Sequence, residues 1–172
     1  MTGSRGAGER PILIRGGTLV TPSLILRGGA VLIDGGTIAA VFADERETRN
    51  WIKARGDITD VLDASGDFVL PGFVDLHCHG GGGYDFMDGD PEGIVRAART
   101  HLLGGTTSIM PTTLASSRVA LDACLAAYAQ AKKAPDCPEF LGLHLEGPYF
   151  AMSQRGAQDP SHIRNPDPAE YL

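Results

Sequence analysis

Two apolar runs of this chain end at side chains of the kind that bind metal ions. The first run ends at His77 and His79, and the second ends at His144 and Glu146. Successive side chains of an extended strand point to opposite faces, so residues two positions apart share a face. Each pair should therefore project from one face at the point where a buried strand ends. Because parallel barrels carry their chemistry at the carboxyl ends of their strands, this pattern predicts a metal centre at one edge of a parallel sheet.

From residue 67 onward, strand-like and helix-like segments alternate. Crossovers of this length suit parallel pairing, so the alternation predicts an α/β fold. A complete TIM (β/α)8 barrel needs roughly 250 residues, so this part of the chain has room for only about three barrel strands. The expected elements are a strand over 68–76, a helix over 91–103, a strand over 106–112, a helix from Ser116 or Ser117 to about Ala131, and a strand over 140–145.

Local signals mark the ends of the two expected helices. Asp90 can cap the first helix, Pro91 suits its first turn, and Gly104 can end it. The buried stripe of the second helix is expected at Val119, Ala123, Ala127 and Ala131.

The part of the chain before residue 67 contains short β-rich runs. A hairpin turn is expected at 34–36, because the glycines there accept the positive φ that such turns require. A short helix is expected around Trp51. The runs cover residues 12–14, 18–20, 30–33 and 37–41. The predicted division is a disordered leader at 1–10, which has no signal-peptide core, a small β-rich part at 11–66, and βα units at 67–172.

Charge and cysteine content narrow the class of protein. The net charge of −6 argues against non-specific nucleic-acid binding, which needs a basic face. No run approaches the roughly 18 apolar residues of a membrane span. The three cysteines form no spaced disulfide framework, so a reducing cytoplasmic location is expected, with no nucleic-acid or membrane partner.

The residue types at the strand ends favour a catalytic metal site. Neutral imidazoles such as His77 and His79 suit Zn²⁺. The carboxylate of Glu146, at the end of a buried strand, needs an ion or hydrogen bonds to offset its desolvation. Ordinary strand-end histidines and a structural ion pair are the plainer alternatives. Asp75 is either a partner for a histidine N–H or a barrel-interior acid, and His144 either supports a metal ligand or packs in the core.

Two loops near these strand ends could contact a substrate. The backbone amides of Gly80 to Gly83 could line a pocket, or this segment is a flexible connector. The backbone near Ala157 and the side chains of Arg155 and Gln158 could hold a sugar phosphate, and the alternative is an ordinary surface loop.

These motifs resemble the amidohydrolase superfamily, whose members place a small β-sandwich before a metal-dependent TIM barrel. Pro-Gly-Phe-Val-Asp-Leu-His-x-His at 71–79 resembles the end of the first barrel strand of that superfamily. Within it, the N-acetylglucosamine-6-phosphate deacetylases are similar in the glycine run after His79, in Gly-Gly-Thr-Thr-Ser at 104–108, in His-Leu-Glu-Gly-Pro at 144–148 and in Arg-Gly-Ala-Gln-Asp-Pro at 155–160. The likeness covers most of residues 11–172.

The resemblance implies a fold and an activity. The fold would be the N-terminal part of such a barrel, preceded by part of the sandwich at 11–66. Glu146 would be the principal metal ligand, His77 and His79 would complete that site or add a second metal position, and Ala157 and Gln158 would contact substrate. The cofactor would be one or two divalent ions, zinc foremost, with iron, cobalt or manganese as alternatives. The reaction would convert N-acetylglucosamine 6-phosphate, a small-molecule amino-sugar phosphate, to glucosamine 6-phosphate and acetate, in a full-length homodimer.

The acid/base aspartate of these enzymes belongs to later barrel strands and is expected beyond Leu172. The chain of 172 residues is therefore expected to hold no catalytic residue of its own and to be an inactive fragment. Two other interpretations stay open. One is an amidohydrolase that acts on a cyclic amide, although many of those use a carbamylated lysine in place of this glutamate. The other is a non-catalytic short scaffold protein.

Overall fold

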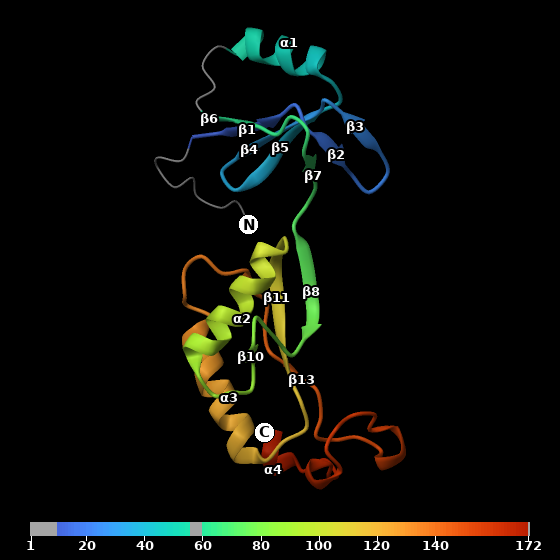
Figure 1. Ribbon diagram of the computed structural model, residues 1–172, viewed down its shortest axis with the longest axis vertical. Helices are drawn as coiled ribbons and strands as arrows, with labels where there is room; N and C mark the ends of the chain where they lie inside the picture. The colour runs from blue at the N-terminus through green and yellow to red at the C-terminus, as the bar shows by residue number, and fades with distance from the viewer. Residues whose placement is uncertain (1–9, 56–59, 172) are drawn as a thin grey trace. The chain divides into compact units, whose positions relative to one another are not determined.

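The computed structural model describes residues 10–55 and 60–171. The chain divides into two compact units, residues 1–71 and 72–172, each with its own sheets (Figure 1). Each unit also has its own buried cluster. Of the expected leader at 1–10, all but Arg10 lies outside the described residues. None of the helices in the described part of the chain is long and apolar enough to cross a membrane.

The first unit holds two small sheets. Its strands are β1 (Ile12–Arg15), β2 (Thr18–Val20), β3 (Ile25–Arg27), β4 (Ala30–Asp34), β5 (Thr37–Phe42), β6 (Asp60–Asp63) and β7 (Phe68–Val69). One sheet has the order β5-β4-β1-β6, and the other has the order β3-β2-β7. The strands predicted at 12–14, 18–20, 30–33 and 37–41 are confirmed as β1, β2, β4 and β5.

The turn between β4 and β5 is the predicted hairpin. Gly35 and Gly36 have φ of 57° and 74°, the conformation that lets a two-residue turn follow the twist of its strands. The helix expected around Trp51 is α1 (Glu45–Arg55). Trp51 packs its ring 5.4 Å from that of Phe42, beside a buried cluster that includes Leu13.

The second unit is built on a parallel sheet. Strand β11 (Thr106–Thr113) pairs in parallel with β8 (Phe73–Cys78), β12 (Glu139–Phe140) and β13 (His144–Leu145). Helices α2 (Pro91–Leu103) and α3 (Arg118–Ala131) form the crossovers. The remaining elements are β9 (Gly80–Gly81), β10 (Tyr84–Asp85), the short 3-10 helices η1 (Met152–Gln154) and η2 (Pro160–His162), and α4 (Pro168–Tyr171). The predicted α/β class with parallel pairing is confirmed.

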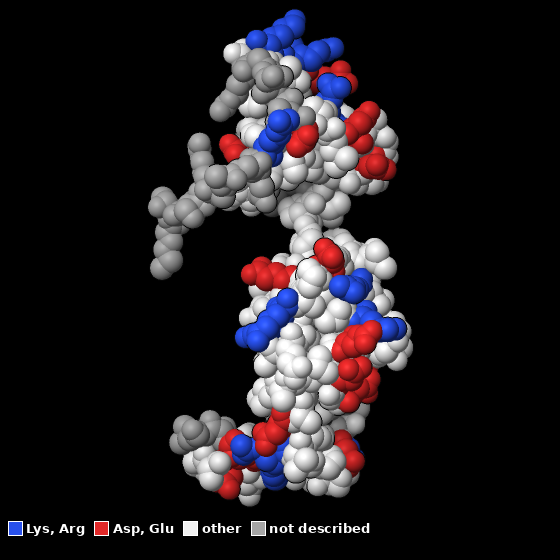
Figure 2. All heavy atoms as spheres, turned by 90° about the vertical axis from the view of Figure 1, so that its left-hand side faces the viewer, with Lys and Arg blue, Asp and Glu red and all other residues white. Residues whose placement is uncertain are grey.

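Both crossover helices begin at the predicted caps and pack on one side of β11. The Asp90 carboxylate accepts from two backbone N–H groups of the first turn of α2, and the Ser117 hydroxyl accepts from one in α3. The buried cluster between the helices and the sheet consists of Phe86, Ile94, Ala97, Ile109, Ala127 and Ala131. On the face shown in Figure 2, acidic and basic side chains of this unit are intermingled.

The strand predicted over 68–76 is divided. Phe68 and Val69 form β7, which pairs with β2 in the first unit, whereas β8 begins at Phe73 in the second. Pro71 lies between them, and proline has no N–H to give to a ladder. The compact units accordingly separate after Pro71, five residues later than the predicted break at 66/67.

Two further predictions were wrong in detail. The strand predicted over 140–145 is interrupted between β12 and β13, although the Leu141 N–H still donates to the Ile109 carbonyl at 3.0 Å.

The buried stripe predicted for α3 is also wrong in part: Val119 is 79% exposed, and the buried residues begin instead at Leu121. An α-helix has 3.6 residues per turn, so each step of four residues rotates the side chain about 40° further around the helix axis. A row of residues spaced only by four therefore drifts away from the face that packs on the core.

Candidate metal centre

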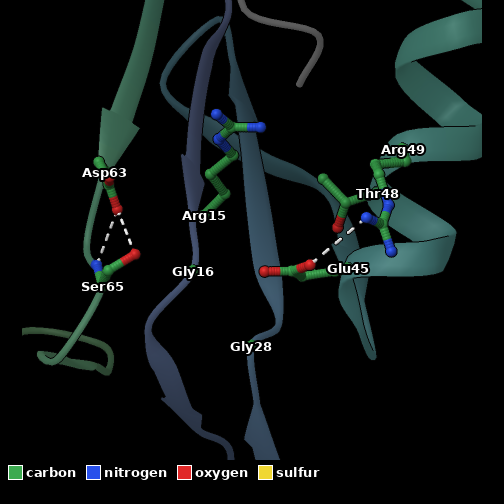
Figure 3. Close-up of a pocket in the computed structure, with 8 residues that line it drawn as sticks. All are labelled: Arg15, Gly16, Gly28, Glu45, Thr48, Arg49, Asp63 and Ser65. Atoms are coloured by element: carbon green, nitrogen blue, oxygen red, sulfur yellow. Dashed lines mark hydrogen bonds and ion pairs between the residues drawn. The ribbon is translucent and has the colours of Figure 1, made fainter.

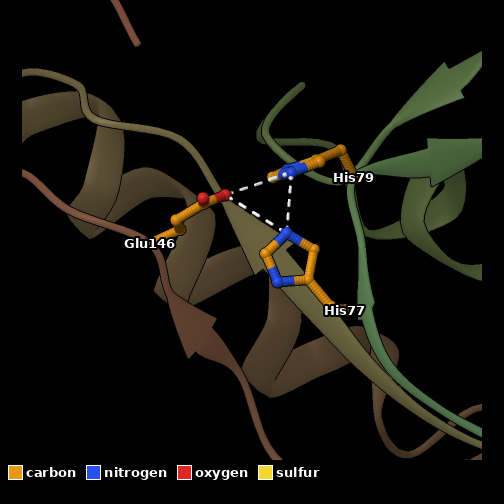
Figure 4. A group of neighbouring side chains, drawn as sticks. All are labelled: His77, His79 and Glu146. Carbon is orange, nitrogen blue, oxygen red and sulfur yellow. Dashed lines mark hydrogen bonds and ion pairs between the residues drawn. The ribbon is translucent and has the colours of Figure 1, made fainter. Parts of the chain in front are cut away.

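Three side chains from two segments meet at the carboxyl ends of β8 and β13. His77 Nε2 and His79 Nε2 lie 3.2 Å apart. Glu146 Oε2 lies 3.3 Å from His77 Nε2 and 3.2 Å from His79 Nε2 (Figure 4). Among the described residues, this is a cluster of three candidate ligands that could hold a metal ion. The structure therefore brings together the three residues that the sequence predicts as ligands.

The spacing of the three donor atoms fits a tetrahedral ion. Bonds of about 2.0–2.1 Å to nitrogen or oxygen place neighbouring tetrahedral ligands about 3.3 Å apart, and the three observed distances are 3.2, 3.3 and 3.2 Å. Two imidazoles and one carboxylate leave one tetrahedral position open, as in a catalytic zinc site. The donor set also suits other first-row divalent metals.

The hydrogen bonding of His79 supports a cation between these atoms. Its Nδ1 lies 3.1 Å from the Thr112 carbonyl oxygen, which can only accept, so Nδ1 carries the hydrogen. In the neutral ring, Nε2 then presents a lone pair toward the Glu146 carboxylate. Two acceptors at 3.2 Å repel unless a proton or a cation lies between them, and a divalent cation satisfies both.

The local backbone differs from the strict alternation that the sequence suggests. Cys78 ends β8 and Leu145 ends β13, so His79 and Glu146 each lie one residue beyond a strand. Gly147 follows with a φ of 89°, and a Cβ there would come 2.7 Å from the ring of Phe150. Only glycine suits this turn, which directs the chain away immediately after the carboxylate.

The residues expected to support the ligands are close by, with different contacts. Asp75, predicted either as a partner for a histidine N–H or as a barrel-interior acid, accepts through its Oδ1 from the backbone N–H of His77 at 3.1 Å. The carbonyl of Thr112, which the sequence analysis missed, takes the ring N–H of His79 instead. His144 lies edge-on to the ring of His77, with ring centroids 5.0 Å apart.

Burial, and after it the neighbouring Asp75, raises the pKa of Cys78 to about 11, which keeps this thiol protonated at neutral pH.

The glycine run after His79 is a packed hairpin, not a flexible connector. β9 and β10 pair antiparallel, and His101 Nε2 on α2 lies 2.9 Å from the Gly80 carbonyl oxygen. A Cβ on Gly80 would come 2.2 Å from the backbone carbonyl oxygen of Tyr84, and a Cβ on Gly81 would come 2.9 Å from His101 Nε2. The glycines therefore allow the hairpin to pack tightly against the helix beside the candidate ligands.

The loop at 155–158 is held by its own side chains. Gln158 is 6% exposed, and its Oε1 accepts from the Ala115 N–H at 2.7 Å. Arg155 donates to the backbone carbonyls of Gly156 and Gln158. Ala157 is exposed. Of the two predicted substrate contacts, Ala157 is thus exposed and open to a ligand. The side-chain oxygen of Gln158 already accepts a hydrogen bond from within the chain.

A charged cluster that the sequence analysis did not identify holds the segment after Glu146. The Arg164 guanidinium donates to the carbonyl of Ser116, before α3, and its backbone N–H donates to the carbonyl of Pro148. Arg164 also pairs with Glu170, whose carboxylate accepts from the Tyr149 hydroxyl at 2.7 Å. The turn that follows the candidate ligand is thereby tied to the start of α3.

Acid should weaken this cluster. Hydrogen bonds from Arg164, and after it from Tyr149, lower the pKa of Glu170 from 4.5 to about 2. A carboxyl whose pKa is lower in the folded state stabilises the fold above its unfolded pKa, and this contribution is lost as the pH falls through the folded pKa. The difference in thermal midpoint between the wild type and Glu170→Gln should therefore shrink between about pH 4.5 and pH 2. The exposed Glu139 provides the control Glu139→Gln. A difference that stays constant over this range would contradict the assignment.

The first unit contains a hollow lined by charged side chains (Figure 3). It has a volume of about 210 Å³ and contains Arg15 and Asp63 from the strands and Glu45 and Arg49 from α1. Glu45 pairs with Arg49 at 3.7 Å, and both side chains are about two-thirds exposed. Its charges are of both signs and solvated, so the strand-end cluster of the second unit is the stronger candidate site.

Comparison with known proteins gives a consistent result. The sequence pattern of the Amidohydrolase family matches residues 68–170. The N-acetylglucosamine-6-phosphate deacetylase of Bos taurus is 30% identical over 175 residues, covering 96% of this chain and 40% of the relative. The enzyme of that name from Lysinibacillus sphaericus is 38% identical over 117 residues, covering 67% of this chain and 30% of the relative.

A solved structure is similar in fold to most of this chain. It is a mutant of N-acetyl-D-glucosamine-6-phosphate deacetylase from Mycobacterium smegmatis in complex with N-acetyl-D-glucosamine-6-phosphate, with a TM-score of 0.73 and 28% identity. The likeness covers 94% of this chain and 39% of that one. The chain thus spans about 40% of the length of the Bos taurus relative and of this structure.

Proposed function

The chain belongs to the amidohydrolase family, and on that premise we propose that it carries the first part of the metal centre of an N-acetylglucosamine-6-phosphate deacetylase. The observation that supports this most is the meeting of two imidazole nitrogens and one carboxylate oxygen within 3.2–3.3 Å. The relatives named above act, by their names, on N-acetylglucosamine 6-phosphate.

The proposed architecture follows from the same relatives. The second unit would be the start of a TIM barrel, and the first unit would be part of a small β-sandwich. Several strand side chains of the second unit fit this arrangement, because a closed barrel would cover them: Phe73, Val74 and Leu76 are 55–60% exposed. In the first unit, both sheets line an apolar groove of about 390 Å³ that further strands of a sandwich would fill. A full-length form is proposed to be a cytoplasmic homodimer.

Each residue of the site has a proposed part in amide hydrolysis. Glu146 supplies the negative charge that holds a divalent ion, and His77 and His79 supply neutral nitrogen donors. When bound, such an ion polarises a carbonyl oxygen and lowers the pKa of a coordinated water toward about 7. The backbone of Ala157, on the exposed loop, would contact the amino-sugar phosphate, with Gln158 placed next to it.

The complete activity is proposed for a polypeptide that spans the full length of the relatives. The acid/base aspartate that protonates the leaving amine would come from a later barrel strand, so the 172-residue chain by itself would be inactive. The products would be glucosamine 6-phosphate and acetate, formed in amino-sugar catabolism.

The substrate can be tested directly. In a version of the protein as long as its relatives, acetate release from N-acetylglucosamine 6-phosphate should exceed release from the unphosphorylated sugar by at least about tenfold in kcat/KM. A single charge-assisted contact contributes about 1.5–3 kcal/mol, and 1.4 kcal/mol corresponds to a factor of ten. The galactosamine epimer serves as the second comparison. Equal rates with and without the phosphate would rule out the phosphate assignment.

A further inference from the structure

The strand that carries His77 contains an extra residue just before the site. Ile109 in β11 pairs with Asp75, and Pro111 pairs with Cys78. Two steps along β11 therefore correspond to three steps along β8, which defines a β-bulge across Leu76 and His77. Pro111 has no N–H to offer to the ladder, and a proline in a strand with neighbours on both sides is normally found at such a bulge.

Side chains satisfy the backbone groups that the bulge releases. The His77 N–H donates to Asp75 Oδ1 at 3.1 Å. The Cys78 N–H donates to Thr112 Oγ1 at 3.2 Å, and the same hydroxyl donates to the Met110 carbonyl at 3.2 Å. A hydroxyl has one donor and two acceptor sites, so the Thr112 hydroxyl serves as donor and acceptor at once.

Thr112 also connects the two segments that carry the candidate ligands. Its carbonyl oxygen accepts from the ring of His79 at 3.1 Å. On the opposite side, Thr112 is the register partner of His144 in β13, two residues before Glu146. Thr112 is fully buried. One residue thus fixes the backbone at Cys78, the ring of His79 and the strand that leads to Glu146.

We propose that Thr112 is a positioning residue of the metal centre. Its hydroxyl holds the bulge in β8 in register, and this register places the His79 ring where the Thr112 carbonyl fixes its tautomer and turns Nε2 toward Glu146. The inference rests on the proposed metal-dependent function. It adds a residue that contacts neither the metal nor the substrate and acts through His79.

Three variants of the chain separate this role from a general effect on folding. Thr112→Val removes the hydroxyl and keeps the shape, whereas Thr112→Ser keeps the hydroxyl. Thr113→Val is the matched control, because Thr113 is fully buried next in sequence and its hydroxyl is the one buried side-chain oxygen without a hydrogen-bond partner in the described part of the chain. Circular dichroism checks that each variant is folded.

The first readout is titration with Co²⁺, followed by its visible absorption. Loss of a group that orients a metal ligand typically weakens affinity by 10–100-fold. We expect Thr112→Val to weaken Co²⁺ binding by at least about 10-fold and to change the absorption bands, while Thr112→Ser and Thr113→Val resemble the wild type. Unchanged affinity and spectrum in Thr112→Val would overturn the inference. A wild-type chain that binds no Co²⁺ would count against the proposed function instead.

The second readout needs no metal. Long-range proton–nitrogen NMR of the metal-free wild type should show a hydrogen on Nδ1 of His79, where the Thr112 carbonyl accepts it, and Thr112→Val should shift or weaken the signal of this Nδ1–H. A wild-type His79 without a hydrogen on Nδ1 would overturn the inference whether or not the variant folds. A Thr112→Val spectrum identical to that of the wild type would do so as well.

Discussion

Glu146→Gln should weaken the binding of Zn²⁺ or Co²⁺ to this chain by more than about 100-fold. Loss of a residue that only supports a metal ligand costs 10–100-fold in affinity, and this change removes a ligand together with its charge. The remaining donors, His77 and His79, are both neutral and provide no charge to offset the ion. The side chain of Glu146 is 27% exposed, so the fold should tolerate the amide.

Isothermal titration calorimetry or competition with a chelator measures this loss. Glu139→Gln is the matched control, since Glu139 is an exposed glutamate at the start of β12, and it should bind metal like the wild type. If Glu146→Gln binds the ion with unchanged affinity, the ion is held elsewhere and the site assignment fails. If both variants lose binding equally, the effect comes from overall charge.

Phe86→Ala should cost the second unit about 3–5 kcal/mol, the range measured for truncating a buried phenylalanine. Phe86 is fully buried in the cluster between the helices and β11. Its backbone N–H donates to the His79 carbonyl at 2.9 Å, and its carbonyl accepts from the thiol of Cys124 at 3.2 Å. A loss of this size is a large part of the 5–15 kcal/mol by which most domains are stable.

Urea unfolding followed by far-UV circular dichroism measures this cost, and the fluorescence of Trp51, the single tryptophan, follows the first unit separately. Phe73→Ala makes the same chemical change at a side chain that is 55% exposed and should cost less than about 1 kcal/mol. Equal costs for the two variants would show that the cluster around Phe86 is not the core of this unit.

The sequence predicts local structure well wherever a short-range signal decides it. Asp90 and Ser117 cap their helices, and Gly35 with Gly36 closes the predicted hairpin. In each case the deciding atoms lie within a few residues of one another. The convergence of His77, His79 and Glu146 was also predictable, because parallel strands bring their carboxyl ends to the same edge.

Features decided by distant partners were predicted less well. Phe68 and Val69 look like the start of a barrel strand, but their ladder partners are Thr18 and Leu19 of β2 in the first unit. The strands β3 and β6 were missed because they are short and lie at sheet edges, where little burial shapes their composition. The apolar content of these segments does not indicate which strand each of them pairs with.

The support of the site also depended on tertiary structure. Asp75 shares the predicted face with the histidines, yet the bulge in β8 turns its carboxylate to the backbone of His77. The group that orients the His79 ring is the main-chain carbonyl of Thr112. Every residue has such a carbonyl, so no residue type in the sequence could indicate this contact.

The cluster around Arg164 has a consequence for how fast an ion is exchanged. Glu146 is followed by a turn whose Pro148 carbonyl is held by Arg164, and Arg164 is tied in turn to Ser116 and Glu170. A shift of the Glu146 backbone away from the site therefore requires these contacts to break, while β8 and β11 can stay paired. We expect the loss of these contacts to raise the dissociation rate of the ion, so that side chains that never touch the metal contribute to its kinetic retention.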